Sequence, residues 1–149
     1  MKNALITGLN GRLAPYLQTS LQNEFVKVIP FNRDNLDIGN RQEQLTYIIQ
    51  NKVDAIFHLA TGDKKWVGTL ASIAKELDIP FLFTSTESVF EPSSSGPFTP
   101  DRQPDATGDY GVYKIECELA ALKENPNAII ARLGWQMFDT FKKDNLLTH

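Results

Sequence analysis

The chain has 149 residues, of which 42% are hydrophobic and 22% charged, a size and composition typical of one soluble globular domain. Its net charge of −3 and scattered basic residues argue against nucleic acid or an anionic membrane as a partner. The single cysteine excludes an internal disulfide. We find neither a signal peptide nor an apolar run long enough to span a membrane, so we expect a cytoplasmic protein. His58 and His149 lie far apart in the sequence, and no metal site is expected.

Short apolar runs alternate with helical patterns along the chain. The predicted strands are 2–7, 26–31, 54–60, 80–85 and 127–133, and the predicted helices are 11–23, 41–51, 67–78 and 108–124. Most of these strands lack the alternation of a half-exposed sheet. We therefore expect a parallel sheet covered on both faces, which is a Rossmann-like, doubly wound α/β domain with three layers that spans residues 1–149.

A glycine turn, TGLNGRLA, joins the first predicted strand to the first predicted helix. Gly8, Gly11 and Ala14 fit the spacing G-x-x-G-x-x-[GA], in which small residues let the backbone approach a pyrophosphate at a helix N-terminus. A tight turn that binds no nucleotide is the alternative interpretation. After the second strand, Arg33 precedes Asp34, an order that favours NADP without excluding NAD or plain solvated loop charges.

A tyrosine and a lysine one helical turn apart are the candidate chemical groups. Tyr110 stands four residues before Lys114, so both can face one ligand, whereas Tyr113 diverges from the pair. An ammonium beside a phenol would lower the pKa of the phenol toward the working range. Ser85 and Thr86, which close the fourth strand, are placed to hold a substrate carbonyl.

The same helix carries an apolar stripe that we expect to face the sheet. The stripe consists of Val112, Ile115, Leu119 and Leu122. On this view, Tyr110 and Lys114 lie on the opposite side with Cys117 and Ala121. These two small residues suggest a helix contact across a homodimer interface, although Cys117, like His58, is first interpreted as a packing residue.

Several segments together resemble the extended short-chain dehydrogenase/reductase superfamily, and within it the dTDP-4-dehydrorhamnose reductase family. The matching segments are TGLNGRLA (7–14), LDI (36–38), FLFTSTESVFEP (81–92), DYGVYKIECE (109–118) and ARLGW (131–135). Glu87 and Ser88 replace the aspartate and tyrosine of the family signature in the third of these segments.

This resemblance implies hydride transfer from NADPH or NADH to a nucleotide-linked 4-keto sugar. Tyr110 would donate the proton, Lys114 would tune Tyr110 and hold the cofactor ribose, and Thr86 would position the keto oxygen. The residues implied to bind NADP(H) or NAD(H) are Gly8, Asn10, Gly11, Arg12, Leu13, Arg33, Asp37, Ile38, Leu59, Ala60, Thr61, Tyr110 and Lys114.

Two departures from the family leave alternatives open. Residues 60–70 are too few for the asparagine-bearing insert of the family, and Trp66 in this segment is interpreted as a core aromatic. The family also continues well beyond this length, so most of the C-terminal substrate-binding portion is expected to be missing. One alternative is thus a catalytically weak or inactive NAD(P)-binding module with a regulatory or scaffold role. The other is an α/β protein that binds no nucleotide.

Overall fold

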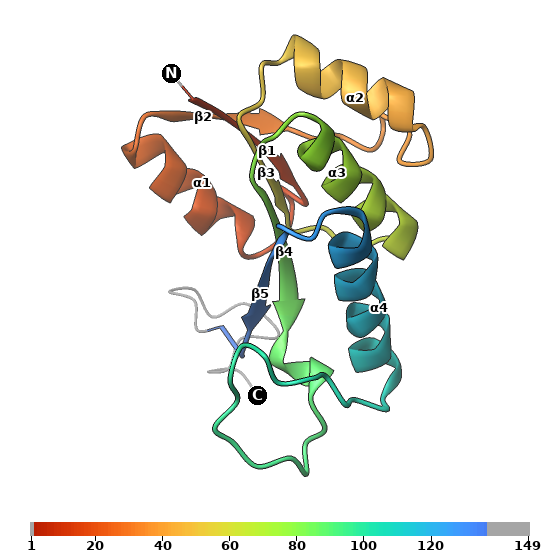
Figure 1. The fold of residues 1–149 in the computed structure, drawn as a ribbon. Helices are drawn as coiled ribbons and strands as arrows, with labels where there is room; N and C mark the ends of the chain where they lie inside the picture. Colours follow the sequence, from red (N-terminus) through yellow and green to blue (C-terminus); the bar gives the residue numbers. More distant parts are fainter. Residues whose placement is uncertain (1, 137–149) are drawn as a thin grey trace.

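A computed structural model describes residues 2–136, which form one parallel sheet with helices on both faces (Figure 1). The strands are β1 (Lys2–Thr7), β2 (Val26–Pro30), β3 (Ala55–His58), β4 (Phe81–Thr86) and β5 (Ile129–Leu133). The helices are α1 (Ala14–Asn23), α2 (Arg41–Gln50), α3 (Lys64–Glu76), α4 (Asp109–Glu124) and the short 3-10 helix η1 (Glu87–Val89). The predicted doubly wound Rossmann-like fold is confirmed.

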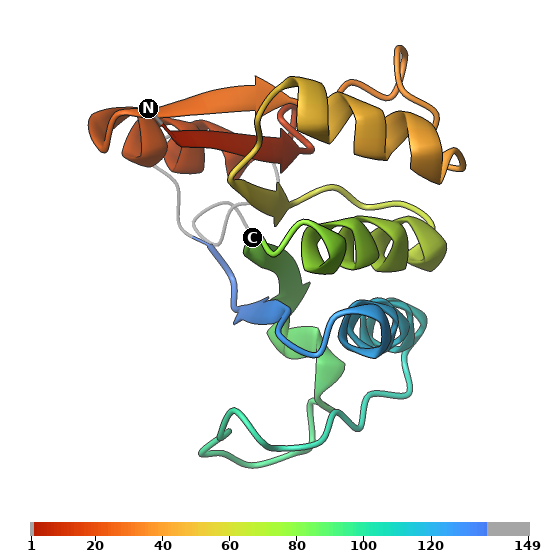
Figure 2. The same cartoon turned by 45° about the horizontal axis from the view of Figure 1, so that its top comes forward.

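In the sheet order β2-β1-β3-β4-β5, the chain adds β2 on one side of β1 and then adds β3, β4 and β5 on the other side, so the direction in which strands are added reverses between β1 and β3. Because parallel crossovers are right-handed, this reversal puts α1 on one face and α2, α3 and α4 on the other, as Figures 1 and 2 show. Ligands of open α/β sheets bind outside the carboxyl ends of the strands at such a switch point. The fold therefore directs attention to the segments that follow β1, β3 and β4.

Among the element boundaries that differ from the sequence-based ones, three have local reasons. Helix α1 begins at Ala14 rather than residue 11, so the glycine turn is longer than predicted. Strand β3 ends at His58 rather than residue 60, because the next two backbone N–H groups bond to the side chain of Thr7 instead of a strand. Helix α3 begins at Lys64 rather than residue 67, since the Asp63 carboxylate accepts a hydrogen bond from a backbone N–H of its first turn.

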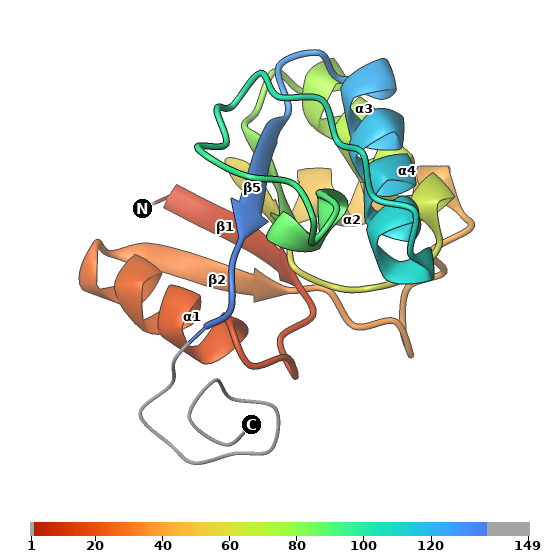
Figure 3. The ribbon, with the colours of Figure 1, turned by 90° about the horizontal axis from the view of Figure 1, so that it is seen from below.

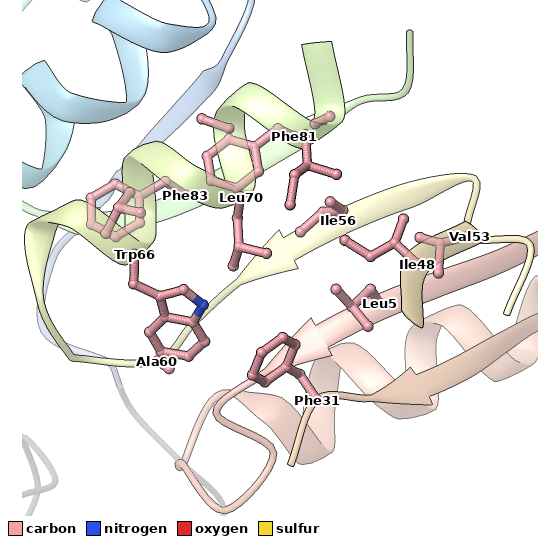
Figure 4. Packing of buried hydrophobic residues seen from close by; sticks show 14 of the residues in the cluster. Leu5, Phe31, Ile48, Val53, Ile56, Ala60, Trp66, Leu70, Phe81 and Phe83 are labelled. Carbon is pink, nitrogen blue, oxygen red and sulfur yellow. The ribbon is translucent and has the colours of Figure 1, made fainter. Parts of the chain in front are cut away.

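The core lies between the sheet and the helices α2, α3 and α4 (Figure 4). Trp66, only 1% exposed, packs against Phe31 with 5.3 Å between ring centroids, which confirms it as a core aromatic. His58 is also fully buried, between the ring of Trp66 and those of Phe81 and Phe83 on β4. The interpretation of His58 as a packed core residue is confirmed.

Burial of His58 should make the stability of the fold depend on pH. Burial, assisted by the charge of Lys114, lowers the pKa of His58 from 6.5 to about 3. As the pH falls, the unfolded chain therefore takes up this proton before the folded chain does. The contribution of neutral His58 to the unfolding free energy is complete above pH 6.5 and declines as the pH falls toward 3. Between pH 7 and pH 5 we expect wild type to lose about 2 kcal/mol more unfolding free energy than His58→Asn.

Urea unfolding at several pH values measures this difference. The only other histidine in the chain, His149, is common to both proteins and cancels in the comparison. Parallel pH profiles for the two proteins would show that His58 titrates normally.

The buried side of α4 is the reverse of the one predicted. Its inward residues are Gly111, Lys114, Cys117, Glu118 and Ala121, while Val112, Leu119 and Leu122 are 40%, 61% and 38% exposed. The prediction fails because α4 approaches its neighbours too closely for large side chains. A Cβ added to Gly111 would lie 2.4 Å from the carbonyl oxygen of Ser88, and one added to Gly68 on α3 would lie 3.4 Å from that of Ala120.

This reversal also corrects the surface suggested for a homodimer. Cys117 and Ala121 are completely buried within the chain, so they cannot meet a second copy. Cys117 is confirmed as a packing residue, and a homodimer stays a prediction without an assigned surface. Within residues 2–136, no helix is both long and apolar enough to cross a membrane.

Candidate functional site

Apart from Tyr110 and Lys114 on α4, the predicted cofactor residues lie in segments that follow the carboxyl ends of three neighbouring strands. Gly8, Asn10, Gly11, Arg12 and Leu13 follow β1; Arg33, Asp37 and Ile38 follow β2; and Leu59, Ala60 and Thr61 follow β3. The order of the strands therefore brings segments that are far apart in the sequence to one edge of the sheet.

Gly8 brings the glycine turn onto the residues after β3. Its φ of +73° lies in the left-handed region, and a Cβ there would lie 2.8 Å from the backbone nitrogen of Ala60. Both the conformation and the close approach require glycine. The backbone N–H of Gly11 donates to the carbonyl oxygen of Gly8 at 2.9 Å and closes the turn.

The start of α1 offers backbone donors to an anion. Among residues 2–136, no side chain caps the helix at Leu13, and a proline occupies its first turn, as is common at a helix N-terminus. The uncapped N–H groups and the positive end of the helix dipole favour a phosphate at this position. A dinucleotide pyrophosphate therefore fits the chemistry of the turn.

Arg33 reaches across the strand ends to the segment that follows β3. Its Nη1 donates to the carbonyl oxygen of Thr61 at 3.4 Å, and its guanidinium lies 6.0 Å from the ring centroid of Trp66. No ion pair holds Arg33 in the described part of the chain. The guanidinium is exposed and can meet a phosphate.

Asp37 and Ile38 have structural contacts in the turn that leads to α2. The carboxylate of Asp37 accepts from the backbone N–H of Gly39 at 2.8 Å. The carbonyl oxygens of Asp37 and Ile38 accept from the side-chain amide of Gln44 at 3.2 and 2.9 Å. These contacts fix the backbone here, and a role toward a cofactor stays a prediction.

A pocket at the end of β4 joins two of the three predicted catalytic residues. It has a volume of about 410 Å³, and its lining includes Thr86, Tyr110 and Trp135. A neighbouring pocket of about 790 Å³ extends from Tyr110 and Trp135 along the loop after η1. Figure 3 shows the elements that carry these residues, with η1 between the end of β5 and the first turn of α4.

The hydroxyl of Thr86 has polar neighbours on its own loop. It donates to the Glu87 carboxylate at 3.2 Å and accepts from the backbone N–H of Ser88 at 3.1 Å. These bonds hold the hydroxyl at the pocket in which Tyr110 lies. Thr86 and Tyr110 can therefore contact the same ligand.

Lys114 is buried behind this pocket. Its ammonium donates to the carbonyl oxygen of Thr84 at 2.7 Å and lies 4.4 Å from the ring centroid of Phe83. Burial lowers the pKa of Lys114, although Cys117 and Glu118 oppose this effect. The structure thus places Lys114 beside β4, one helical turn from Tyr110.

The pKa of Tyr110 moves in the direction opposite to the one expected. Burial of the phenol, and then the negative charge of Glu87, raise its pKa above the usual 10.0, and Lys114 is not among the causes. A raised pKa keeps the phenol protonated at neutral pH, the state needed to donate a proton. Tyr110 is 53% exposed, so its hydroxyl remains accessible to a substrate.

Tyr113 has a structural contact. Its hydroxyl donates to the carbonyl oxygen of Gly62 at 2.7 Å and accepts from the N–H of the same residue at 3.0 Å. These two bonds tie α4 to the segment between β3 and α3. Tyr110 is therefore the tyrosine whose position suits chemistry.

Comparison with known proteins places this arrangement in a family. The profile of the RmlD substrate binding domain family matches residues 1–148. The chain belongs to this family. The chain is similar to a dTDP-4-dehydrorhamnose reductase from Sinorhizobium fredii, with 27% identity over 146 residues that make up 87% of this chain and 49% of that protein. The resemblance drawn from the sequence is confirmed.

Solved structures of RmlD family relatives agree with the fold. The dTDP-4-dehydrorhamnose reductase of Clostridium acetobutylicum superposes with a TM-score of 0.80 at 25% identity, over 98% of this chain and 57% of that one. The Bacillus anthracis reductase, solved in complex with NADP, gives 0.77 at 22% identity, over 91% and 54% of the two chains. The chain spans about half the length of the curated relatives it matches.

An ionic network beside the pocket escaped the sequence-based list of site residues. Glu118, buried on α4, accepts from Ser85 at 2.5 Å and forms a forked ion pair with Arg132, whose Nη2 lies 2.7 Å from Oε2. Arg132 also donates to the carbonyl oxygen of Arg102 in the loop. Glu118 and Arg132 both belong to segments that resemble the RmlD family, and opposite charges within a helix and a strand of those segments were the available signal.

Proposed function

We propose that this RmlD family chain takes part in the NADP(H)-dependent reduction of a nucleotide-linked 4-keto sugar. The observation that carries the proposal is the meeting of Thr86 and Tyr110 at one pocket, with Lys114 one helical turn farther along α4. The reductase names of the relatives support the same reaction. Because the chain spans about half of those proteins, the full reaction is part of the proposal.

The residues at the strand ends fit a dinucleotide. The backbone at Gly8 and Gly11 and the uncapped start of α1 would hold the pyrophosphate. When bound, the reduced nicotinamide supplies a hydride to the carbonyl carbon of the sugar. The complex of the Bacillus anthracis reductase with NADP supports the choice of cofactor.

In this reaction the chain would supply the proton and hold the substrate. Tyr110 would transfer its phenolic proton to the keto oxygen, which becomes the new hydroxyl as the carbon is reduced. Thr86 would turn its hydroxyl away from the Glu87 carboxylate and donate a hydrogen bond to the same keto oxygen. To stabilise the phenolate that Tyr110 leaves behind, the ammonium of Lys114 would have to turn from the Thr84 carbonyl toward Tyr110.

A second candidate is a binding module that keeps the cofactor and turns over slowly. The position of Lys114 favours it, since its ammonium bonds to the Thr84 carbonyl and does not lower the pKa of Tyr110. The test is to add dTDP-4-dehydrorhamnose to the protein with NADPH and follow the loss of reduced nicotinamide by absorbance. Turnover supports the reductase, whereas NADPH binding without turnover supports the module.

Arg33 should determine the preference for NADPH over NADH. We expect Arg33→Ala to weaken NADPH binding about 10- to 100-fold, because the adenosine 2′-phosphate loses a charged partner. NADH lacks this phosphate, and its affinity should change less than about 3-fold. Nicotinamide fluorescence measures both affinities.

The matched control for Arg33 is Arg41→Ala. Arg41 is also an exposed arginine, but its partner is Glu76 on α3. Its removal should leave both affinities unchanged. Equal losses of NADPH and NADH affinity in Arg33→Ala would contradict a 2′-phosphate contact.

A further inference from the structure

Outside the residues of the proposed reaction, the most notable feature is a buried network of hydrogen bonds that links β3 to β1. His58 is fully buried, and its Nδ1 lies 2.9 Å from the hydroxyl oxygen of Thr7, its partner in the strand register. The same oxygen accepts hydrogen bonds from the backbone N–H groups of Leu59 at 3.1 Å and Ala60 at 3.2 Å.

The geometry fixes the protons in this chain of contacts. A hydroxyl has two acceptor positions and one proton to donate. Leu59 and Ala60 occupy both acceptor positions of Thr7, so its proton points to Nδ1 of His58. His58 must then be neutral, with its own proton on Nε2. The lowered pKa of His58 agrees with a neutral ring.

Burying an imidazole at this position costs free energy that an apolar side chain would not, so packing alone does not explain why a histidine is present. Nε2 of His58 has no hydrogen-bond partner among residues 2–136, and the nearby ring of Trp66 is perpendicular to the imidazole, with centroids 4.6 Å apart at 88°. An apolar side chain would fill the same space without an unpaired donor. What only a polar side chain offers is the acceptor for Thr7.

The Thr7 contact acts on the backbone that faces the glycine turn. Thr7 immediately precedes Gly8, and Gly8 lies against Ala60, one of the two residues that Thr7 binds. The Thr7 hydroxyl therefore ties the ends of β1 and β3 together where they meet. Its orientation depends on the acceptor at residue 58.

We propose that His58 is a positioning residue that orients the Thr7 hydroxyl and thereby holds the Leu59–Ala60 backbone against the glycine turn. Its effect on the cofactor rests on the proposed function, since these backbone segments are the ones proposed to bind NADPH. His58 touches no ligand itself. It acts through Thr7.

The test compares an acceptor with an apolar side chain at residue 58. His58→Asn keeps a carbonyl acceptor near the position of Nδ1, whereas His58→Leu fills the space without one. We expect His58→Leu to weaken NADPH binding about 10-fold and His58→Asn less than about 3-fold. In a double-mutant cycle, His58→Leu and Thr7→Val should be strongly non-additive.

Amide hydrogen exchange gives a readout that does not need the cofactor. The Leu59 and Ala60 amides should exchange faster in His58→Leu than in wild type or His58→Asn, while amides in β4 stay unchanged. If wild type binds no NADPH, the proposed function fails, but this exchange comparison still decides the role of His58. The inference is overturned if His58→Asn and His58→Leu expose these amides equally, or if neither variant does.

Discussion

Replacing Tyr110 with phenylalanine should lower turnover of the 4-keto sugar by about 10²- to 10⁴-fold, the usual contribution of a general acid. The NADPH affinity should stay within about 3-fold of wild type, because the phenol is proposed to meet the substrate oxygen. Tyr110 is half exposed at the pocket it shares with Thr86, so its loss leaves no buried polar group unpaired. Single-turnover oxidation of NADPH separates the chemical step from binding.

Tyr113→Phe on the same helix is the matched control. It removes a hydroxyl that bonds to both polar groups of Gly62. We expect this variant to lose about 1 kcal/mol of unfolding free energy and to keep its rate of chemistry. If Tyr113→Phe abolishes turnover and Tyr110→Phe does not, the assignment of the two tyrosines is reversed. If Tyr110→Phe loses cofactor affinity and turnover equally, Tyr110 is a structural residue.

Glu118→Gln should have the largest effect on stability, a loss of about 3 kcal/mol of unfolding free energy. The glutamate is buried and pairs with Arg132 and Ser85. Its neutral replacement leaves the guanidinium of Arg132, which is 22% exposed, without a counter-charge. Because Arg132 also binds the loop after η1, the loop should loosen as well.

The control for Glu118 lies two residues away. Glu116 pairs with Lys64 at 2.9 Å, but both side chains are nearly half exposed. Glu116→Gln should therefore change the unfolding free energy by less than about 1 kcal/mol. Chemical unfolding of both variants measures the contrast. Similar values for the two would mean that the buried pair contributes no more than a surface ion pair.

The sequence predicted the sheet well because strand and helix patterns alternate cleanly along the chain. It failed at the end of β3, where the side chain of Thr7 takes the backbone N–H groups of Leu59 and Ala60. A contact between residues so far apart leaves no mark in local periodicity. The predicted strand therefore ran two residues too far.

Helix α4 shows why the apolar pattern misled. Its inward side carries Gly111 and Ala121, which allow close packing, and the charged Lys114 and Glu118, which find partners on the sheet. Hydrophobicity alone assigns such residues to the surface. Without knowledge of these partners, the larger apolar residues were the natural choice for the core side.

Tyr110 and Lys114 lie one turn apart on α4, as their spacing indicates, but their joint role in chemistry stays a prediction. The effect of Glu87 on the pKa of Tyr110 depends on how η1 meets α4, which the sequence does not indicate. Whether the predicted cofactor residues bind a dinucleotide stays a prediction.

Backbone NMR of the full chain, titrated with NADPH, would show where on the sheet the dinucleotide binds. We expect shifts confined to the amides that follow β1, β2 and β3 and to the surroundings of Thr86 and Lys114. Amides around the groove between α3 and α4, which Gly68 and Leu119 line, should not move. Shifts centred on that groove, or none at millimolar NADPH, would contradict a dinucleotide site at the carboxyl ends of the strands.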